Sequence, residues 1–323
     1  MSRGPSFRLL IICVGSLAFT QVRAAAYHAP HNAYGAPDLS GNWTNLSLTS
    51  IERPAEAASL IVNDADGAAL ERRLTELRVH PANDALGQRS TEAWPDAHLA
   101  RINGQVRTSW IVSPADGKIP YSPEGRRILA AQRGPSPTAF DNPENRPDAE
   151  RCLVASWGAT GPPILAPNYA ANYQIMQSPG EVAILSEMNH DVRIVRLNSP
   201  HQPAVMRRWM GDSVGHWDKD TLVVETINFA PGYSYSPWGL LLSADAKVTE
   251  RFTRVSATQI LYQYEVDDPA IFTQVWRGEM PFEAAKGPPL EFACHEGNYS
   301  LPDVLAGVRH AEAETAAAAE PRR

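Results

Sequence analysis

Two glutamates alternate with apolar residues in strand-length runs, and carboxylates in such positions can do acid–base chemistry. Successive side chains of a β-strand point to opposite faces. Glu225 alternates with Val223 and Ile227, and Glu250 does the same beside Phe252. A carboxylate on an apolar face must pair with a cation or shift its pKa, and general acids and bases have shifted pKa values.

The same alternation places other polar groups on the predicted inner face. Arg254 shares the face of Glu250, Tyr262 lies on an aromatic face, and His190 joins Met188 if the chain stays in phase. We predict that the catalytic residues, if the protein is an enzyme, are His190, Glu225 or Glu250 as base and Tyr262 or Arg193 as electrophilic partner. The alternative, that such Glu–Arg pairs only hold strands together, stays open.

Aromatic side chains could line a pocket for a flat or apolar ligand, although most aromatic residues simply fill cores. The stretch 230–239 reads APGYSYSPWG and lies between two predicted strands. Loops on rigid scaffolds often carry binding, so we expect it to cover a barrel mouth. The predicted ligand-binding residues are Trp43, Trp217, Tyr233, Tyr235, Trp238 and Tyr264.

Short motifs for other chemistries are present, but the residues and secondary structure that these chemistries need around them are missing. Gly-Asp-Ser at 211–213 resembles a serine esterase motif, but it leads into a predicted hairpin and no late Asp-x-x-His follows. His295-Glu296 begins a zinc motif whose second histidine is replaced by Tyr299. No phosphate loop, dinucleotide fingerprint or haem motif is present. We therefore expect no metal site and no cofactor.

The N-terminus predicts export. Residues 1–26 combine Arg3 and Arg8, an apolar run over 9–20 and small residues at 24–26, the pattern of a secretory signal peptide. The run is shorter than the roughly 20 apolar residues of a membrane span, and no later segment reaches that length. We expect a periplasmic or secreted protein without a membrane span in the mature chain.

Charge and cysteine content narrow the partners and the compartment. Loss of the three arginines of 1–26 takes the net charge from −7 to −10, which disfavours nucleic acid. Cys152 and Cys294 then remain. In an oxidising compartment they form a disulfide that closes a long loop, worth about 4–5 kcal/mol, or they stay as two buried thiols. The sequence does not predict the oligomeric state.

Strand-length runs separated by turn signals dominate the second half of the chain. No helix of ten residues or more lies between them, so a doubly wound α/β fold is excluded. We predict a mainly β protein, an antiparallel lipocalin-like barrel or a curled sandwich, whose concave side shelters a compartment. The predicted strands are 173–177, 182–188, 192–197, 206–210, 222–229, 248–255, 260–266, 272–278 and 290–294.

The remaining organisation follows from helical spacing and composition. We expect one β-rich domain over 27–310, in which 27–160 holds the first strand, long loops and two helices, and 173–300 holds the antiparallel meander. Leu70, Leu74 and Leu77 recur at helical spacing between Asp64 and His80. A second short helix is predicted at 123–132. The Ala-, Glu- and Arg-rich tail, 311–323, is expected to be disordered.

Several longer motifs carry a resemblance over nearly the whole mature chain. They are DLSGxW at 38–43, GDSxGxW at 211–217, DTLVVET at 220–226, VDDP at 266–269 and CHEGNY at 294–299. With them, the chain resembles a large family of exported, mostly uncharacterised bacterial proteins. The resemblance implies export and a β-rich fold, and it implies no activity.

Three functions are therefore considered. The first is an exported barrel that binds a small apolar or aromatic ligand. The second is a cofactor-free lyase, isomerase or hydrolase that uses acid–base residues in the same barrel. The third is a structural or assembly protein of the envelope, which requires no cavity but an exposed apolar patch.

Overall fold

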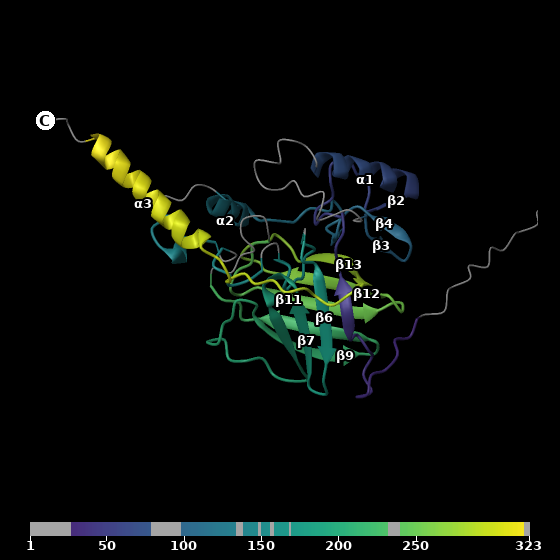
Figure 1. Cartoon of the computed structure of the whole chain (residues 1–323). Helices are drawn as coiled ribbons and strands as arrows, with labels where there is room; N and C mark the ends of the chain where they lie inside the picture. The colour runs from purple at the N-terminus through teal and green to yellow at the C-terminus, as the bar shows by residue number, and fades with distance from the viewer. Residues whose placement is uncertain are drawn as a thin grey trace, which may run out of the picture.

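Nine strands close into a barrel, which forms the body of the molecule in Figure 1. The computed structural model describes residues 27–78, 98–133, 138–147, 150–155, 158–167, 169–231 and 240–319. Neighbouring strands run in chain order, and the last strand pairs with the first. The barrel strands are β1 (Gly41–Thr44), β6 (Asn172–Gln177), β7 (Glu181–Ser186), β8 (Val192–Leu197), β9 (Asp212–Asp218), β10 (Thr221–Ile227), β11 (Lys247–Arg254), β12 (Gln259–Asp267) and β13 (Trp276–Ala284).

The predicted fold class is confirmed, with a difference in strand direction. All neighbours in the barrel are antiparallel except β8 and β9, which run parallel over a short pairing. The stretch 206–210 contains no strand, and β9 instead occupies the GDSxGxW motif, which resembles a turn in sequence. Gly215 fits there because a Cβ would lie 2.7 Å from Cγ1 of Val195 on β8. The predicted strand at 290–294 is also not formed.

Smaller elements cover the barrel from outside. β5 (Ile111–Ser113) extends the sheet beyond β13, and a separate sheet joins β2 (Ile61–Val62), β4 (Gln105–Arg107) and β3 (Arg101–Ile102). Both helices predicted in the first half exist, as α1 (Asp64–Arg78) and α2 (Pro123–Arg133). Short 3₁₀ turns lie at Pro143–Asn145 and Met188–His190. α1 packs Leu70 against Val106 of β4 and Leu48 in a second, smaller core.

The chain ends in α3 (Ser300–Ala319), which projects away from the barrel (Figure 1). Residues 311–319, predicted as part of a disordered tail, continue this helix, and the side chains of 311–318 are exposed. Alanine and glutamate have high helix propensity, which accounts for helix without a buried face. Residues 320–323 lie outside the described part of the chain.

One end of the barrel is closed by the residues of the opening motif. Trp43 is buried, donates from Nε1 to the carbonyl of Leu39 at 2.9 Å, and lies beneath the guanidinium of Arg254 at 5.5 Å. Gly41 has φ +139°, a conformation that favours glycine, and its backbone lies against the Trp43 ring. Gly-x-Trp thus plugs this end of the barrel, and a cation–π contact with Arg254 and apolar packing hold the Trp43 ring in place.

Aromatic rings fill the middle of the barrel. Alternate positions of β11, β12 and β13 point inward, and they bring Phe252, Tyr262 and Phe282 within 4.9–6.4 Å of one another by ring centroids. The ring of Tyr264 lies on Gly278 of β13, where a Cβ would be 2.2 Å from Cζ of the tyrosine. The core therefore depends on a glycine at this position.

Replacing Gly278 with alanine should lower the free energy of unfolding by about 1–3 kcal/mol, the usual range for overpacking a core. The Tyr264 ring would have to move within closely packed surroundings. Gly287→Ala is the matched control, because nothing lies within 4 Å of its Cβ position. Urea denaturation followed by tryptophan fluorescence measures both, and equal stabilities would contradict the packing described.

Candidate functional site

A segment without regular structure fills the other end of the barrel. This mouth segment, residues 158–165, folds back on itself because Gly161 N and Leu165 N both donate to the carbonyl of Gly158. Gly158 and Gly161 have φ near +70°, and a Cβ on Gly161 would lie 2.7 Å from Ile164 N. Ile164 has no exposed surface. The glycines thus allow a tight turn that inserts an apolar side chain into the barrel.

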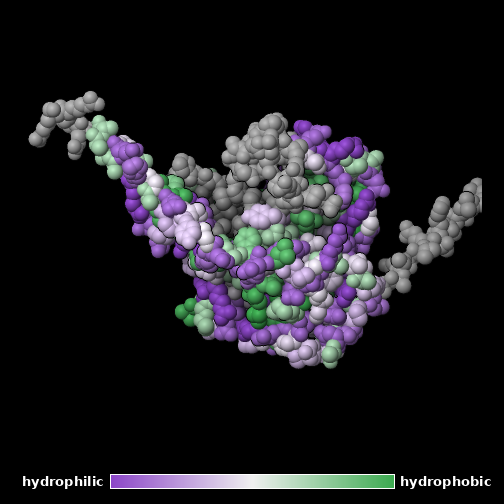
Figure 2. All heavy atoms as spheres, in the orientation of Figure 1, coloured by the Kyte–Doolittle hydropathy of each residue, from purple (hydrophilic) through white to green (hydrophobic). Residues whose placement is uncertain are grey.

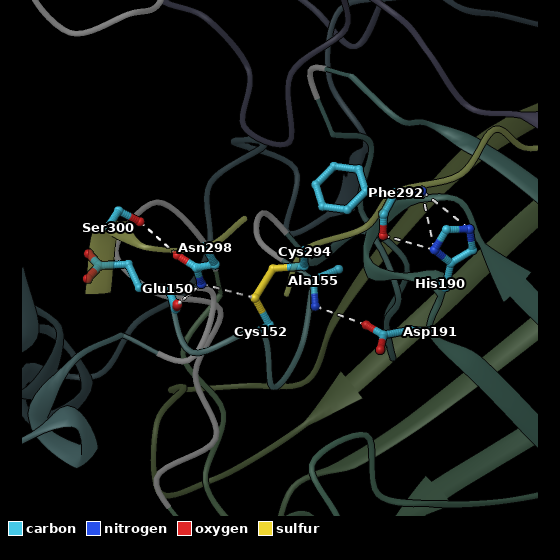
Figure 3. The surroundings of a disulfide bond; sticks show 9 residues. All are labelled: Glu150, Cys152, Ala155, His190, Asp191, Phe292, Cys294, Asn298 and Ser300. Atoms are coloured by element: carbon cyan, nitrogen blue, oxygen red, sulfur yellow. Dashed lines mark hydrogen bonds between the residues drawn. A yellow bond between two sulfur atoms is a disulfide. The ribbon is translucent and has the colours of Figure 1, made fainter. Parts of the chain in front are cut away.

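Side chains of the barrel, rather than a strand ladder, hold the mouth segment. Ile164 N donates to the hydroxyl of Tyr262 at 2.7 Å, and the hydroxyl of Tyr173 donates to the carbonyl of Ala159 at 2.8 Å. Asp191 accepts from Thr160 Oγ1 at 2.8 Å and from Ala155 N, a contact drawn in Figure 3. Burial raises the pKa of Asp191, and the Thr160 hydrogen bond opposes this rise. Three polar anchors therefore fix the segment.

Below the mouth segment lies a buried ion pair. Arg193 of β8 donates two hydrogen bonds to the carboxylate of Glu250 on β11, at 2.5 and 3.0 Å. Tyr262 donates its O–H to Glu250 Oε1 at 2.7 Å. The exposed fractions of the Arg193 and Glu250 side chains are 3% and 0%. Burial, and then the Glu250 charge, raise the pKa of Tyr262 well above its usual value, so this phenol stays protonated.

Three of the five predicted catalytic residues thus meet in one network. Arg193, Glu250 and Tyr262 come from strands whose alternation is regular, and their side chains point inward together. Glu250 accepts three hydrogen bonds and has no exposed surface. While the mouth segment is in place, the network therefore offers no position for a substrate.

Glu225 does not join the network. Leu222, Val224 and Thr226 of β10 point inward, so Glu225 faces outward and pairs with Lys247 and with His201. The prediction that it faces the interior is wrong, because β10 buries residues on both faces and its alternation is ambiguous. The Lys247 contact is the largest cause that lowers the pKa of Glu225.

His190 also lies outside the interior. The 3₁₀ turn at Met188–His190 contains Asn189 and His190 at positive φ, which breaks the strand phase that placed His190 inward. His190 is exposed, and its ring hydrogen-bonds to the backbone of Phe292 (Figure 3). It anchors a C-terminal strap, which we define as residues 290–298. Glu187 accepts from Leu290 N in the same strap at 3.2 Å.

A disulfide joins the strap to the chain that leads into the mouth segment. Cys152 and Cys294 are bonded, with their Cα atoms 5.9 Å apart and a separation of 142 positions in sequence (Figure 3). Asn298 of the strap donates to the carbonyl of Glu150. Phe292 packs against a small core that contains Ala155 and Met188. The strap and the mouth segment therefore form one tethered cover.

The predicted ligand-binding residues are spread over the barrel. Trp43 and Trp217 lie at the end opposite the mouth segment, where Trp217 is half-buried beside Leu222 of β10. Tyr264 is buried in the aromatic core, and the ring of Trp276 lies 5.6 Å away. Within the described part of the chain, the Tyr264 hydroxyl has no hydrogen-bond partner. The other three, Tyr233, Tyr235 and Trp238, lie in 232–239, outside the described residues.

Several inward-facing side chains of the barrel are fully buried. Tyr173, Tyr262 and Trp276 each have 0% exposure. A side chain that lined a void of water size would show some accessible surface, so these three do not line one. The sheltered compartment that the sequence predicts therefore does not reach these three rings.

The site contains residues that the sequence analysis did not single out. Tyr173 and Asp191 hold the mouth segment, Ile164 belongs to it, and the Gly- and Pro-rich stretch 158–163 is the only local signal for it in the sequence. Outside the barrel, Asp212 accepts from Arg196, His201 and Gln202 N. This polar cluster fixes the loop between β8 and β9. Ser213 faces inward, and its hydroxyl hydrogen-bonds to that of Thr226.

Other kinds of site find little support in the described residues. There, no three His, Cys, Asp or Glu side chains come together as metal ligands. A surface cleft of about 460 Å³ lies beside the strap between Arg146, Glu296 and Val304. A second, of about 390 Å³, lies beneath α1. Of the helices described, none combines the length and apolar composition that a bilayer crossing needs.

Comparison with known proteins gives no match. No family model, no curated protein and no solved structure is significantly similar to this chain.

Two tyrosines allow a matched test of the network. Tyr262→Phe should lower the free energy of unfolding by about 1–3 kcal/mol, because it leaves Ile164 N without its acceptor and removes one of the two donors to Glu250 Oε1. Tyr264→Phe removes a hydroxyl that has no hydrogen-bond partner among the described residues, so it should be neutral or stabilising. Chemical denaturation of both variants checks this, and a larger loss for Tyr264→Phe would refute the hydrogen-bond assignment.

Proposed function

We propose that this protein binds a small apolar or aromatic molecule inside the barrel, in the space that the mouth segment occupies here. One observation supports this most: the buried polar network ends on the mouth segment and not on a strand. Tyr262 bonds Ile164 N, and Tyr173 bonds the carbonyl of Ala159. Withdrawal of the segment would leave two polar groups amid aromatic walls, the composition typical of small-molecule sites.

The aromatic walls favour a flat ligand. Tyr173, Phe252, Tyr262 and Phe282 contact one another at centroid distances of 4.9–6.4 Å. Ile164 belongs to the same core as these rings and its N–H donates to Tyr262. Rings prefer offset or edge-to-face contacts of 4.5–7 Å, each worth about 0.5–1.5 kcal/mol beyond area burial. A planar ligand that displaced Ile164 would gain such contacts. The structure corresponds in this proposal to the closed, ligand-free state.

Export is part of the proposal. The leader pattern of residues 1–26 supports it, and so does the Cys152–Cys294 bond, because disulfides persist mainly outside the cytosol. A periplasmic or secreted binding protein would meet its ligand in the same compartment in which the strap stays tethered.

The test is direct binding of an uncharged aromatic probe. We expect N-phenyl-1-naphthylamine to bind one site per chain, with fluorescence enhancement and saturation. The apparent affinity of the probe rises with the fraction of molecules in which the mouth segment is open, since only these can bind it. Asp191→Ala removes the acceptor for Thr160 and Ala155, so it should raise the apparent affinity several-fold. Asp218→Asn, at an exposed pair with Arg251, is the control. Absence of saturable binding in both wild type and Asp191→Ala would overturn the proposal.

An assembly role is the second candidate, favoured by an apolar patch on the outer barrel wall. Met176 of β6 and Val192 and Ile194 of β8 have exposed fractions of 42–44%, and Ala183 and Leu185 of β7 lie between them in register. Apolar atoms gather on the face where Figure 1 labels β6 and β7 (Figure 2). Such a face can bury against a second copy around a two-fold axis.

Sedimentation velocity of the chain 27–323 tests this second candidate. If the patch mediates assembly, wild type should sediment as a dimer, and Ile194→Glu should shift it to monomer, because a charge would be buried against the partner. Val205→Glu, at a valine that is 88% exposed in the loop after β8, should leave the dimer intact. A monomer at all concentrations would remove the assembly role and leave the binding proposal untouched.

A further inference from the structure

The mouth segment contacts the barrel as a ligand would, and its contacts have a defined polarity. Tyr262 donates its O–H in a hydrogen bond to Glu250 Oε1, so its oxygen can only accept from the mouth segment, and Ile164 N–H is the donor. Tyr173 has the opposite role, since its O–H donates to the carbonyl of Ala159. The segment therefore supplies one donor and one acceptor to two fixed positions.

The direction of each hydrogen bond is fixed by its surroundings. Glu250 accepts two N–H groups from Arg193 and is a carboxylate in this pair, so the Tyr262 proton must point at it. A backbone carbonyl such as that of Ala159 has no proton to give, so Tyr173 must donate. At Tyr262 this demand also holds for a molecule that replaces the segment, because Glu250 stays in the barrel. At Tyr173 such a molecule reproduces the contact of the segment when it presents an acceptor.

The charge of the interior is also fixed. Arg193 and Glu250 neutralise each other in a bidentate pair that is almost fully buried. A ligand with its own charge would therefore enter a low-dielectric space that holds no unbalanced counter-charge, at a high desolvation cost.

We infer that the ligand is an uncharged aromatic molecule that carries a hydrogen-bond donor directed at Tyr262 and a separate acceptor directed at Tyr173. Phenols and aromatic alcohols that also carry a carbonyl group, and aromatic amides, belong to this class. The inference rests on the proposed binding function, because it assigns polarity to the site that withdrawal of the mouth segment would expose. Tyr262 and Tyr173 are thereby its specificity-determining residues.

Paired probes with the same rings test the two positions. 2-Naphthol has a donor that 2-methoxynaphthalene lacks, and 2-acetonaphthone has an acceptor that 2-ethylnaphthalene lacks. A neutral hydrogen bond contributes about 0.5–1.5 kcal/mol net, or about 2–10-fold in affinity. We expect wild type to prefer 2-naphthol to 2-methoxynaphthalene, and 2-acetonaphthone to 2-ethylnaphthalene, by about this factor in titration calorimetry.

The two tyrosine variants separate the assignments. Tyr262→Phe should abolish the preference for 2-naphthol and keep that for 2-acetonaphthone, and Tyr173→Phe should do the reverse. Asp191→Ala as a shared background raises the open fraction, and circular dichroism confirms that each variant is folded. If a variant does not fold, the probe preferences of the wild-type protein alone decide whether the polarity inference holds.

The outcomes keep the inference apart from the proposed function. If no naphthalene probe binds to wild type or to Asp191→Ala, the binding function itself is wrong. If the probes bind without preference for donor or acceptor, or if Tyr262→Phe and Tyr173→Phe affect both probe pairs alike, binding stands and the polarity inference is overturned. Crossed loss of the two preferences would establish it.

Discussion

The structure depends on one costly interaction, the Arg193–Glu250 ion pair inside the barrel. Two charges without exposed surface are tolerated only when geometry is good and the remaining lone pairs are satisfied. The bidentate contact meets the first condition, and Tyr262 meets the second by donating to Glu250. Because Tyr262 then accepts from Ile164 N, the pair on β8 and β11 also determines how the mouth segment must sit.

This linkage gives the two barrel ends different physical characters. The Trp43 end is closed by strand residues and by Arg254, which hydrogen-bonds backbone carbonyls there. The other end is closed by a piece of chain that contributes no strand and is held by side-chain anchors, the strap and the disulfide. Separating side-chain anchors disrupts no strand ladder, so the mouth end is where an opening costs least.

Sequence alternation predicts the barrel and part of the network, and its failures have local causes. On β11 and β12 one face is apolar and the other polar, so Glu250 and Tyr262 are placed correctly. On β10, Val223 is buried on the outward face and Glu225 on the same face contacts His201 of the loop after β8, so Glu225 is misassigned. Two positive-φ residues before β8 shift the phase for His190. The mouth segment reads as a loop, and its contacts with residues later in the chain, from Tyr173 to Tyr262, place it inside.

The burial of the network bears on which function is physically consistent with it. A barrel selected only for stability gains little from a buried ion pair, because apolar residues of similar volume are often as stable or more so. Tyr264 and Trp276 add buried polar atoms that have no hydrogen-bond partner among the described residues, and each such atom costs free energy in a core. Such groups destabilise a barrel that is permanently filled. In a barrel that exchanges its mouth segment for a polar aromatic ligand, they can hydrogen-bond to that ligand. The polar atoms thus argue for a binding interior more strongly than the aromatic rings, which any core would contain.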